Sequence, residues 1–190
     1  MEQWPLNKIH SRDIPVKDEA GCFWENRGDR FHCGVDLYAP EGSEVVSIEE
    51  CVVVGVGVMT SPSILPYWNT TYYVVTKNDS GIFSKYGELS KASVQEGDKI
   101  SSGQLIGYVG AVLNPQKIDG TSPSYIQKLK DKNTSMLHFE VWKEDPITSH
   151  EDYLGGNWFA KERPVNLIDP TEYLKSVRAK VFREHTSSEE

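Results

Sequence analysis

Turn signals that recur about every eight to twelve residues constrain the fold of this chain more than any other feature. Between them lie short runs rich in Val, Ile and aromatic residues, which are typical of strands. The turn Asn78-Asp79-Ser80-Gly81 joins two of these runs and predicts a hairpin. The runs are 45–48, 51–58, 70–77, 81–89, 98–100, 104–109 and 136–142. This pattern predicts an all-β fold, an antiparallel β-sandwich or barrel.

Two polar segments interrupt the strand pattern, and a helix is expected near the end of the chain. Val112–Ser135 contains a short helical candidate at Tyr125–Lys132, and Lys143–Pro164 is similarly irregular. Thr171–Arg183 predicts a C-terminal helix that follows Pro170. A chain of 190 residues fits one domain, which we place at 1–183 with a disordered tail at 184–190.

Charge and hydropathy exclude several classes of protein. The 20 Lys and Arg against 28 Asp and Glu give a net charge of −8, which disfavours nucleic acid and anionic membranes as partners. The longest apolar run, Cys51–Val58, is far too short to span a bilayer. The first residues show no signal peptide, so a cytoplasmic location is expected, although a chain trimmed of an export signal would look the same. The sequence does not indicate which oligomeric state the protein adopts.

The three cysteines do not form a disulfide framework. Their odd, sparse count favours buried free thiols at Cys22, Cys33 and Cys51. A single bridge between Cys22 and Cys33 is the alternative if the protein is exported.

His32, Asp36 and His138 are the candidate metal ligands. His32 and Asp36 lie four residues apart, where Gly34 indicates a loop entering a strand rather than a helix. His138 lies in an apolar strand, on the same face as Met136 and Glu140. Imidazole nitrogens and carboxylate oxygens are good zinc donors. Taken singly, each histidine is more often a satisfied structural residue than a metal ligand.

Several stretches taken together resemble the lysostaphin-type (LytM-like) zinc metallopeptidases, which are peptidoglycan endopeptidases with a duplicated-hybrid-motif β fold. The resemblance is strongest at RFHCGVDLYAPEGSEVVS, residues 30–47. It continues in family order through KYGELSKASVQEGDKISSGQLIGYVG (85–110), MLHFEVW (136–142) and PVNLIDPTEYL (164–174). It implies the family's β fold for most of the chain outside the two irregular segments.

The resemblance implies one zinc ion held by three residues of this chain. His32 and Asp36 match the family's His-x-x-x-Asp pair, and His138 matches the second histidine of its His-x-His strand. Two histidines and one aspartate leave a position for water, as in catalytic rather than structural zinc sites. Glu140, whose family counterpart is also glutamate, is expected to support His138 from behind.

Two positions depart from the family pattern. The first histidine of the His-x-His strand is Met136 here, and the histidine of the family's Tyr-x-His-Leu stretch is Glu88. Methionine donates no useful hydrogen bond, so hydrolysis is expected to be weak or lost. Three roles stay open for Glu88: a general base, a fourth metal ligand, or a surface residue without a role. The alternative function is an inactive zinc-containing module that binds a peptide, a glycan or a protein.

Five further residues have competing interpretations. Cys33 is expected to point away from its neighbour His32 and not to bind metal, and His150 is expected to be a solvated loop residue. The aromatic residues Tyr67, Trp68 and Tyr72 are equally compatible with the core and with a ligand groove.

Overall fold

The computed structural model describes residues 2–6, 14–146 and 151–187 of the chain. Strands dominate this part of the chain, together with one 3-10 helix and two α-helices. The strands are β1 (Phe31–His32), β2 (Val35–Tyr38), β3 (Glu44–Val46), β4 (Cys51–Thr60), β5 (Thr71–Lys77), β6 (Phe83–Ala92), β7 (Lys99–Ile100), β8 (Leu105–Val109), β9 (Met136–Trp142), β10 (Tyr153–Leu154), β11 (Asn157–Trp158) and β12 (Leu167–Ile168). The helices are η1 (Pro115–Lys117), α1 (Ser124–Gln127) and α2 (Thr171–Ser187). The expected all-β fold is confirmed.

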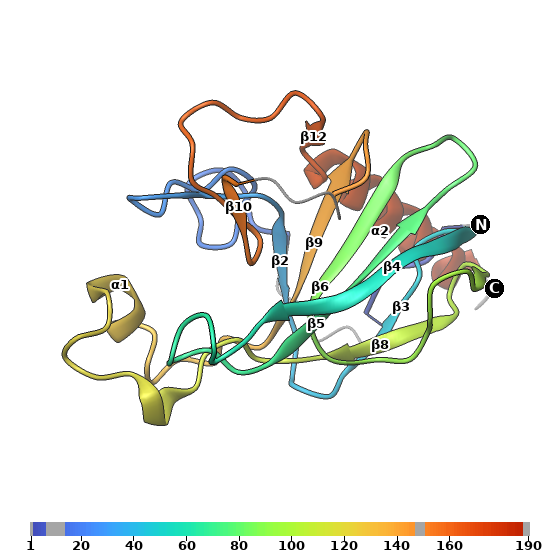
Figure 1. Ribbon diagram of the computed structural model, residues 1–190. Helices are drawn as coiled ribbons and strands as arrows, with labels where there is room; N and C mark the ends of the chain where they lie inside the picture. The colour runs from blue at the N-terminus through green and yellow to red at the C-terminus, as the bar shows by residue number, and fades with distance from the viewer. Residues whose placement is uncertain (1, 7–13, 147–150, 188–190) are drawn as a thin grey trace.

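One large antiparallel sheet forms the body of the molecule (Figure 1). Its strands run in the order β12-β9-β6-β5-β4-β7, with β2 on β9, β8 on β6 and β3 on β8. The expected hairpin is present as β5 and β6, joined by a turn in which Gly81 has a φ of 80°. That left-handed backbone costs glycine little, which is why the turn forms there. The expected strand at 136–142 is β9, with the same bounds.

The main core lies between the sheet and the C-terminal helix. Tyr86 of β6 and Phe139 of β9 are fully buried and pack edge to face, with ring centroids 5.2 Å apart. Leu174 and Val177 of α2 belong to the same cluster and are also fully buried. The helix begins at Thr171 as expected but continues to Ser187, so residues 184–187 are helical rather than part of a tail.

A second, small sheet gives structure to a segment for which the sequence predicts none. It consists of β1, β11 and β10, and it pairs Phe31 with Trp158 and His32 with Asn157. The irregular segment Lys143–Pro164 therefore supplies the strand partner of His32. The expected loop entering a strand is present at Cys33 and Gly34, which connect His32 of β1 in the small sheet to Asp36 of β2 in the large one.

The segment Val112–Ser135 contains η1 and α1 and has an apolar cluster of its own. That cluster consists of Tyr67, Trp68, Leu113, Ile118 and Ile126. In Figure 1 this segment projects to one side of the large sheet. The helical candidate Tyr125–Lys132 is α-helical only in its first part, since α1 ends at Gln127. No helix among the described residues is long and apolar enough to cross a membrane.

Candidate metal centre and its cavity

Neighbouring strands bring the three candidate ligands together. Asp36 of β2 lies directly opposite His138 of β9, and His32 enters from β1. Gly34 permits this approach, because a Cβ at that position would lie 2.4 Å from the Phe139 carbonyl oxygen and 2.9 Å from the His138 ring. All three ligand candidates are buried, with exposures of 3% or less.

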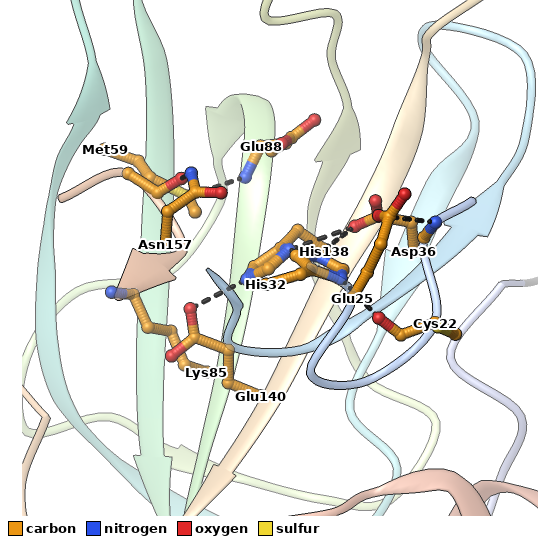
Figure 2. Close-up of polar contacts among 12 residues, drawn as sticks. Cys22, Glu25, His32, Asp36, Met59, Lys85, Glu88, His138, Glu140 and Asn157 are labelled. Carbon is orange, nitrogen blue, oxygen red and sulfur yellow. Dashed lines mark hydrogen bonds and ion pairs between the residues drawn. The ribbon is translucent and has the colours of Figure 1, made fainter. Parts of the chain in front are cut away.

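Three donor atoms converge on one point (Figure 2). His32 Nε2 lies 2.9 Å from His138 Nδ1 and 3.0 Å from Asp36 Oδ1. His138 Nδ1 lies 3.0 Å from the same Asp36 oxygen. Among the described residues, these are the ones that form a group of ligand atoms able to hold a metal ion.

The outer ring nitrogens of both histidines are occupied by acceptors. His32 Nδ1 lies 2.8 Å from the Cys22 carbonyl oxygen, and His138 Nε2 lies 2.7 Å from Glu140 Oε1. A carbonyl or carboxylate oxygen accepts, so in the neutral rings these outer nitrogens carry the protons. The inner nitrogens then present lone pairs toward Asp36 Oδ1. Three lone pairs that face one another are stabilised by a proton or a metal cation between them, and this set of two imidazole nitrogens and one carboxylate oxygen fits a zinc ion.

The surroundings of His138 favour a positive charge at the site, and they raise the pKa of its ring. Burial alone lowers the pKa of this imidazole, but hydrogen bonds to the Asp36 and Glu140 carboxylates outweigh it and raise the pKa to about 9. The pKa of His32 is lowered by its burial and then by the positive charge of Arg27. The His138 ring therefore holds a proton more tightly than the His32 ring does.

Glu140 lies behind His138 in a buried polar network. Besides His138, its carboxylate accepts from Trp142 Nε1 at 2.6 Å and from the Tyr153 hydroxyl at 2.6 Å. Lys85 Nζ donates to that hydroxyl at 2.5 Å. Burial raises the pKa of Glu140, but the positive charges of Lys85 and His138 outweigh it and lower the pKa to about 2. The carboxylate is therefore held ionised against the ring that it orients.

Arg27 clamps the other side of the site, and sequence reasoning missed it. Its guanidinium donates to Asp36 Oδ2 at 3.2 Å, to Glu25 Oε2 at 3.0 Å and to Asn157 Oδ1 at 3.1 Å. Asp36 thus uses one oxygen toward the histidines and the other toward a fixed cation. Tyr153 and Lys85 were missed as well. Their partners are distant in sequence, and no local spacing indicates these contacts.

Glu88 lines the cavity beside the ligands but does not join them. Its backbone has a φ of 60°, and its N–H donates to Met59 Sδ at 3.2 Å. Figure 2 shows its carboxylate directed away from the two imidazoles, and its atoms are outside the converging group. Its Oε2 is buried without a hydrogen-bond partner. Burial, and then the negative charge of Asp36, raise the pKa of Glu88 to about 8.

The cavity at the site has a volume of about 460 Å³. Asp36, Glu88, Met136 and His138 line one end of it, and residues of the segment Val112–Ser135 line the other. Met136 therefore faces the space in which the family's histidine would act. Trp68 lines the cavity as well as packing in its own apolar cluster.

The remaining candidates lie elsewhere. Tyr67 packs in the apolar cluster of Trp68, and Tyr72 packs against the main core. Cys33 is fully buried in an apolar cluster with Trp142 and Trp158, away from the converging ligand atoms. All three cysteines are free. His150 lies outside the described residues.

The comparison with family models decides the family. The model of peptidase family M23 matches residues 30–149, which is more than half of the chain. The chain belongs to peptidase family M23. This family includes the lysostaphin-type enzymes that the sequence resembles. No curated protein matches the sequence significantly.

Several solved structures are similar to this chain. Lysostaphin from Staphylococcus simulans is 21% identical, with a TM-score of 0.53, over 92% of this chain and 53% of that one. The SpoIIQ–SpoIIIAH pore-forming complex is 18% identical, with a TM-score of 0.53, over 91% of both chains. A zinc-containing peptidase from Vibrio cholerae is 24% identical, with a TM-score of 0.47, over 74% of this chain and 36% of that one. This chain thus spans about a third of the Vibrio protein and about half of lysostaphin.

Proposed function

We propose that this M23 domain binds one zinc ion through His32, Asp36 and His138. A peptide, including one of the kind found in peptidoglycan, binds in the adjoining cavity. Hydrolysis of that peptide is weak or lost. The observation that supports this most directly is the convergence of His32 Nε2, Asp36 Oδ1 and His138 Nδ1 within 3.0 Å of one another. A bound zinc ion would polarise a peptide carbonyl and acidify a water molecule.

The chain's own residues divide the remaining work. Glu140 and the Cys22 carbonyl hold the two imidazoles with their lone pairs inward. Arg27 fixes Asp36 and places a permanent positive charge beside the cavity, where negative charge develops in amide hydrolysis. Glu88 is a carboxylate of the cavity without an ion pair, and its raised pKa suits a group that exchanges a proton near neutral pH.

Weak hydrolysis follows from the two substituted positions. Met136 offers a thioether, which donates no hydrogen bond to a developing oxyanion. The Glu88 carboxylate points away from the ligand group and reaches it only after a change of rotamer. Removing one transition-state donor costs on the order of 10²- to 10³-fold in rate, so losing two leaves little of the ordinary mechanism.

Metal analysis tests the proposal first. Purified protein should contain about one zinc per chain, and His138→Ala should contain none. Removal of this ring also takes one hydrogen-bond donor from the buried Glu140 carboxylate, a loss of about 1–3 kcal/mol. Met136→Leu, on the same strand face, is the matched control and should keep its zinc. Full zinc occupancy in His138→Ala, or none in the unchanged protein supplied with zinc, would exclude the site.

Hydrolysis is then measured on the zinc-loaded protein with a quenched-fluorescence pool of random pentapeptides. Weak turnover that disappears in Glu88→Gln assigns the proton transfer to Glu88. Turnover that is unchanged in this variant removes Glu88 from the mechanism.

An inactive binding module is the second candidate function. It is favoured by Met136 at the position of a catalytic histidine, and by the similarity in fold to SpoIIQ, whose structure is that of a complex with SpoIIIAH. Zinc at full stoichiometry, no turnover, and peptide binding that is unchanged in Glu88→Gln would favour this function over hydrolysis.

A further inference from the structure

The segment from Ser124 to Lys132 forms one wall of the cavity. Beyond α1 the chain continues in helical turns, because Leu129 N donates to the Ile126 carbonyl at 2.9 Å and Lys132 N donates to the Leu129 carbonyl at 3.0 Å. Residues three and four apart therefore share a side. The residues of that side, Tyr125, Lys128, Leu129 and Lys132, all line the cavity, together with Ile126.

This wall is anchored to the rest of the molecule. Ile126 is 5% exposed and packs in the apolar cluster of Trp68. The Arg30 guanidinium, two residues before His32, lies 5.5 Å from the centre of the Tyr125 ring and 4.8 Å from that of Phe159. Lys130, on the other side of the segment, donates to the Ile118 carbonyl at 2.9 Å. The position of the wall is thus tied to the strand that carries a metal ligand.

The positive charges of the cavity differ in whether they are already paired. Arg27 pairs with Glu25 and Asp36, and Arg30 pairs with Asp29. Lys128 and Lys132 are exposed and form no ion pair with any residue that the structure describes. Two like charges four residues apart on one helical side repel each other, and a bound anion relieves that repulsion. These lysines face the cavity of a chain whose net charge is −8.

We propose that this wall selects peptides that carry a carboxylate, either on an acidic side chain or at the C-terminus. Lys128 and Lys132 bind the carboxylate, and Tyr125 and Leu129 contact apolar parts of the same peptide. The inference rests on the proposed function in one respect only, which is that a peptide occupies the cavity. It requires neither zinc nor hydrolysis.

Three alanine peptides serve as probes: acetyl-pentaalanine amide, the same peptide with a central glutamate, and acetyl-pentaalanine with a free C-terminal carboxylate. Their affinities are measured by NMR titration, with and without zinc, at low and high salt. The glutamate peptide, the free-carboxylate peptide, or both should bind more tightly than the neutral one, by about two- to fivefold for each lysine engaged. The preference should shrink at high salt. Comparison of the two charged probes separates the two sources of carboxylate.

The double variant Lys128→Gln/Lys132→Gln should remove the preference, so that the charged and neutral peptides bind this variant with equal affinity. The matched control is Lys91→Gln/Lys117→Gln, which removes the same charge from exposed positions outside the cavity. Equal affinity for neutral and charged peptides, no binding of any probe, or equal loss of the preference in the control would overturn the proposal. A preference in protein that fails to bind the zinc supplied to it would support the wall and contradict the metal site. Bound zinc without a preference for charged peptides would support the metal site and contradict the wall.

Discussion

The metal ligands and the neighbouring catalytic positions of the cavity differ in how completely their polar groups are paired. On the ligand side, each ring nitrogen of His32 and His138 has a partner, and Glu140 is itself held by Trp142 and Tyr153. On the catalytic side, which lies beside the ligands in the same cavity lining, Met136 offers no donor, and Glu88 Oε2 is buried without a hydrogen-bond partner among the described residues. We infer from this contrast that holding a metal and activating water are separable properties of this fold. Under the proposed function, this chain keeps the residues for the first and has lost those for the second.

Restoring the family residues is the strongest way to break this contrast. The double variant Glu88→His/Met136→His should raise hydrolysis of the pentapeptide pool by at least about 10²-fold, because each imidazole supplies a donor to the transition state. Histidine tolerates the left-handed backbone at position 88 better than most residues do. Rates are compared at equal zinc content, with Met136→Leu as the control. Turnover equal to that of the unchanged chain would show that the deficiency lies elsewhere.

Weakening the hydrogen-bond network behind the metal ligands is expected to have a smaller effect, on zinc affinity. Tyr153→Phe removes the hydroxyl that joins Lys85 to Glu140, and leaves a buried lysine without that acceptor. Zinc affinity, measured by competition with a chelator, should fall by about tenfold or more, as for other residues that orient a metal ligand. Tyr73→Phe is the control, because the Tyr73 ring also lies beside Lys85 but its hydroxyl is not bonded to Glu140. Unchanged affinity in Tyr153→Phe would show that Glu140 needs no such support.

The pH dependence of folding stability tests the second half of the contrast, the unpaired buried carboxylate of Glu88. In metal-free protein the Glu88 pKa is raised from 4.5 to about 8, so the folded state holds this proton more tightly than the unfolded state. Its contribution to stability is complete below pH 4.5 and is lost as the pH rises through 8. Glu88→Gln should therefore gain stability over the unchanged chain across this window, on the order of a few kcal/mol.

Urea unfolding at several pH values measures this difference, with the exposed Glu96→Gln as the control. Parallel pH profiles for Glu88→Gln and the unchanged chain would contradict the raised pKa.

The sequence predicts those parts of the fold and of the site that have a local sequence pattern or that match the resembled family. The alternation of β9 and the turn at Gly81 are local, and they predict the strands around them. The positions of His32, Asp36 and His138 come from the resemblance. β1, β10 and β11 are two residues long, too short for any periodicity, and they form only because distant segments pair. Arg27, Lys85 and Tyr153 could not be inferred for the same reason, since their partners meet only in the folded chain.

The separation of His32 and His138 along the chain has a consequence for biosynthesis. The two ligands are 106 residues apart, and β1 is completed by a strand at 157–158. A nascent chain that has emerged only through β8 presents His32 and Asp36 but lacks the third donor and the carboxylate that orients it. Closing so long a loop is entropically costly until the sheet between the ligands has formed. If the domain binds zinc as proposed, metal loading would follow synthesis and folding, and we expect a stalled or truncated polypeptide not to sequester the ion.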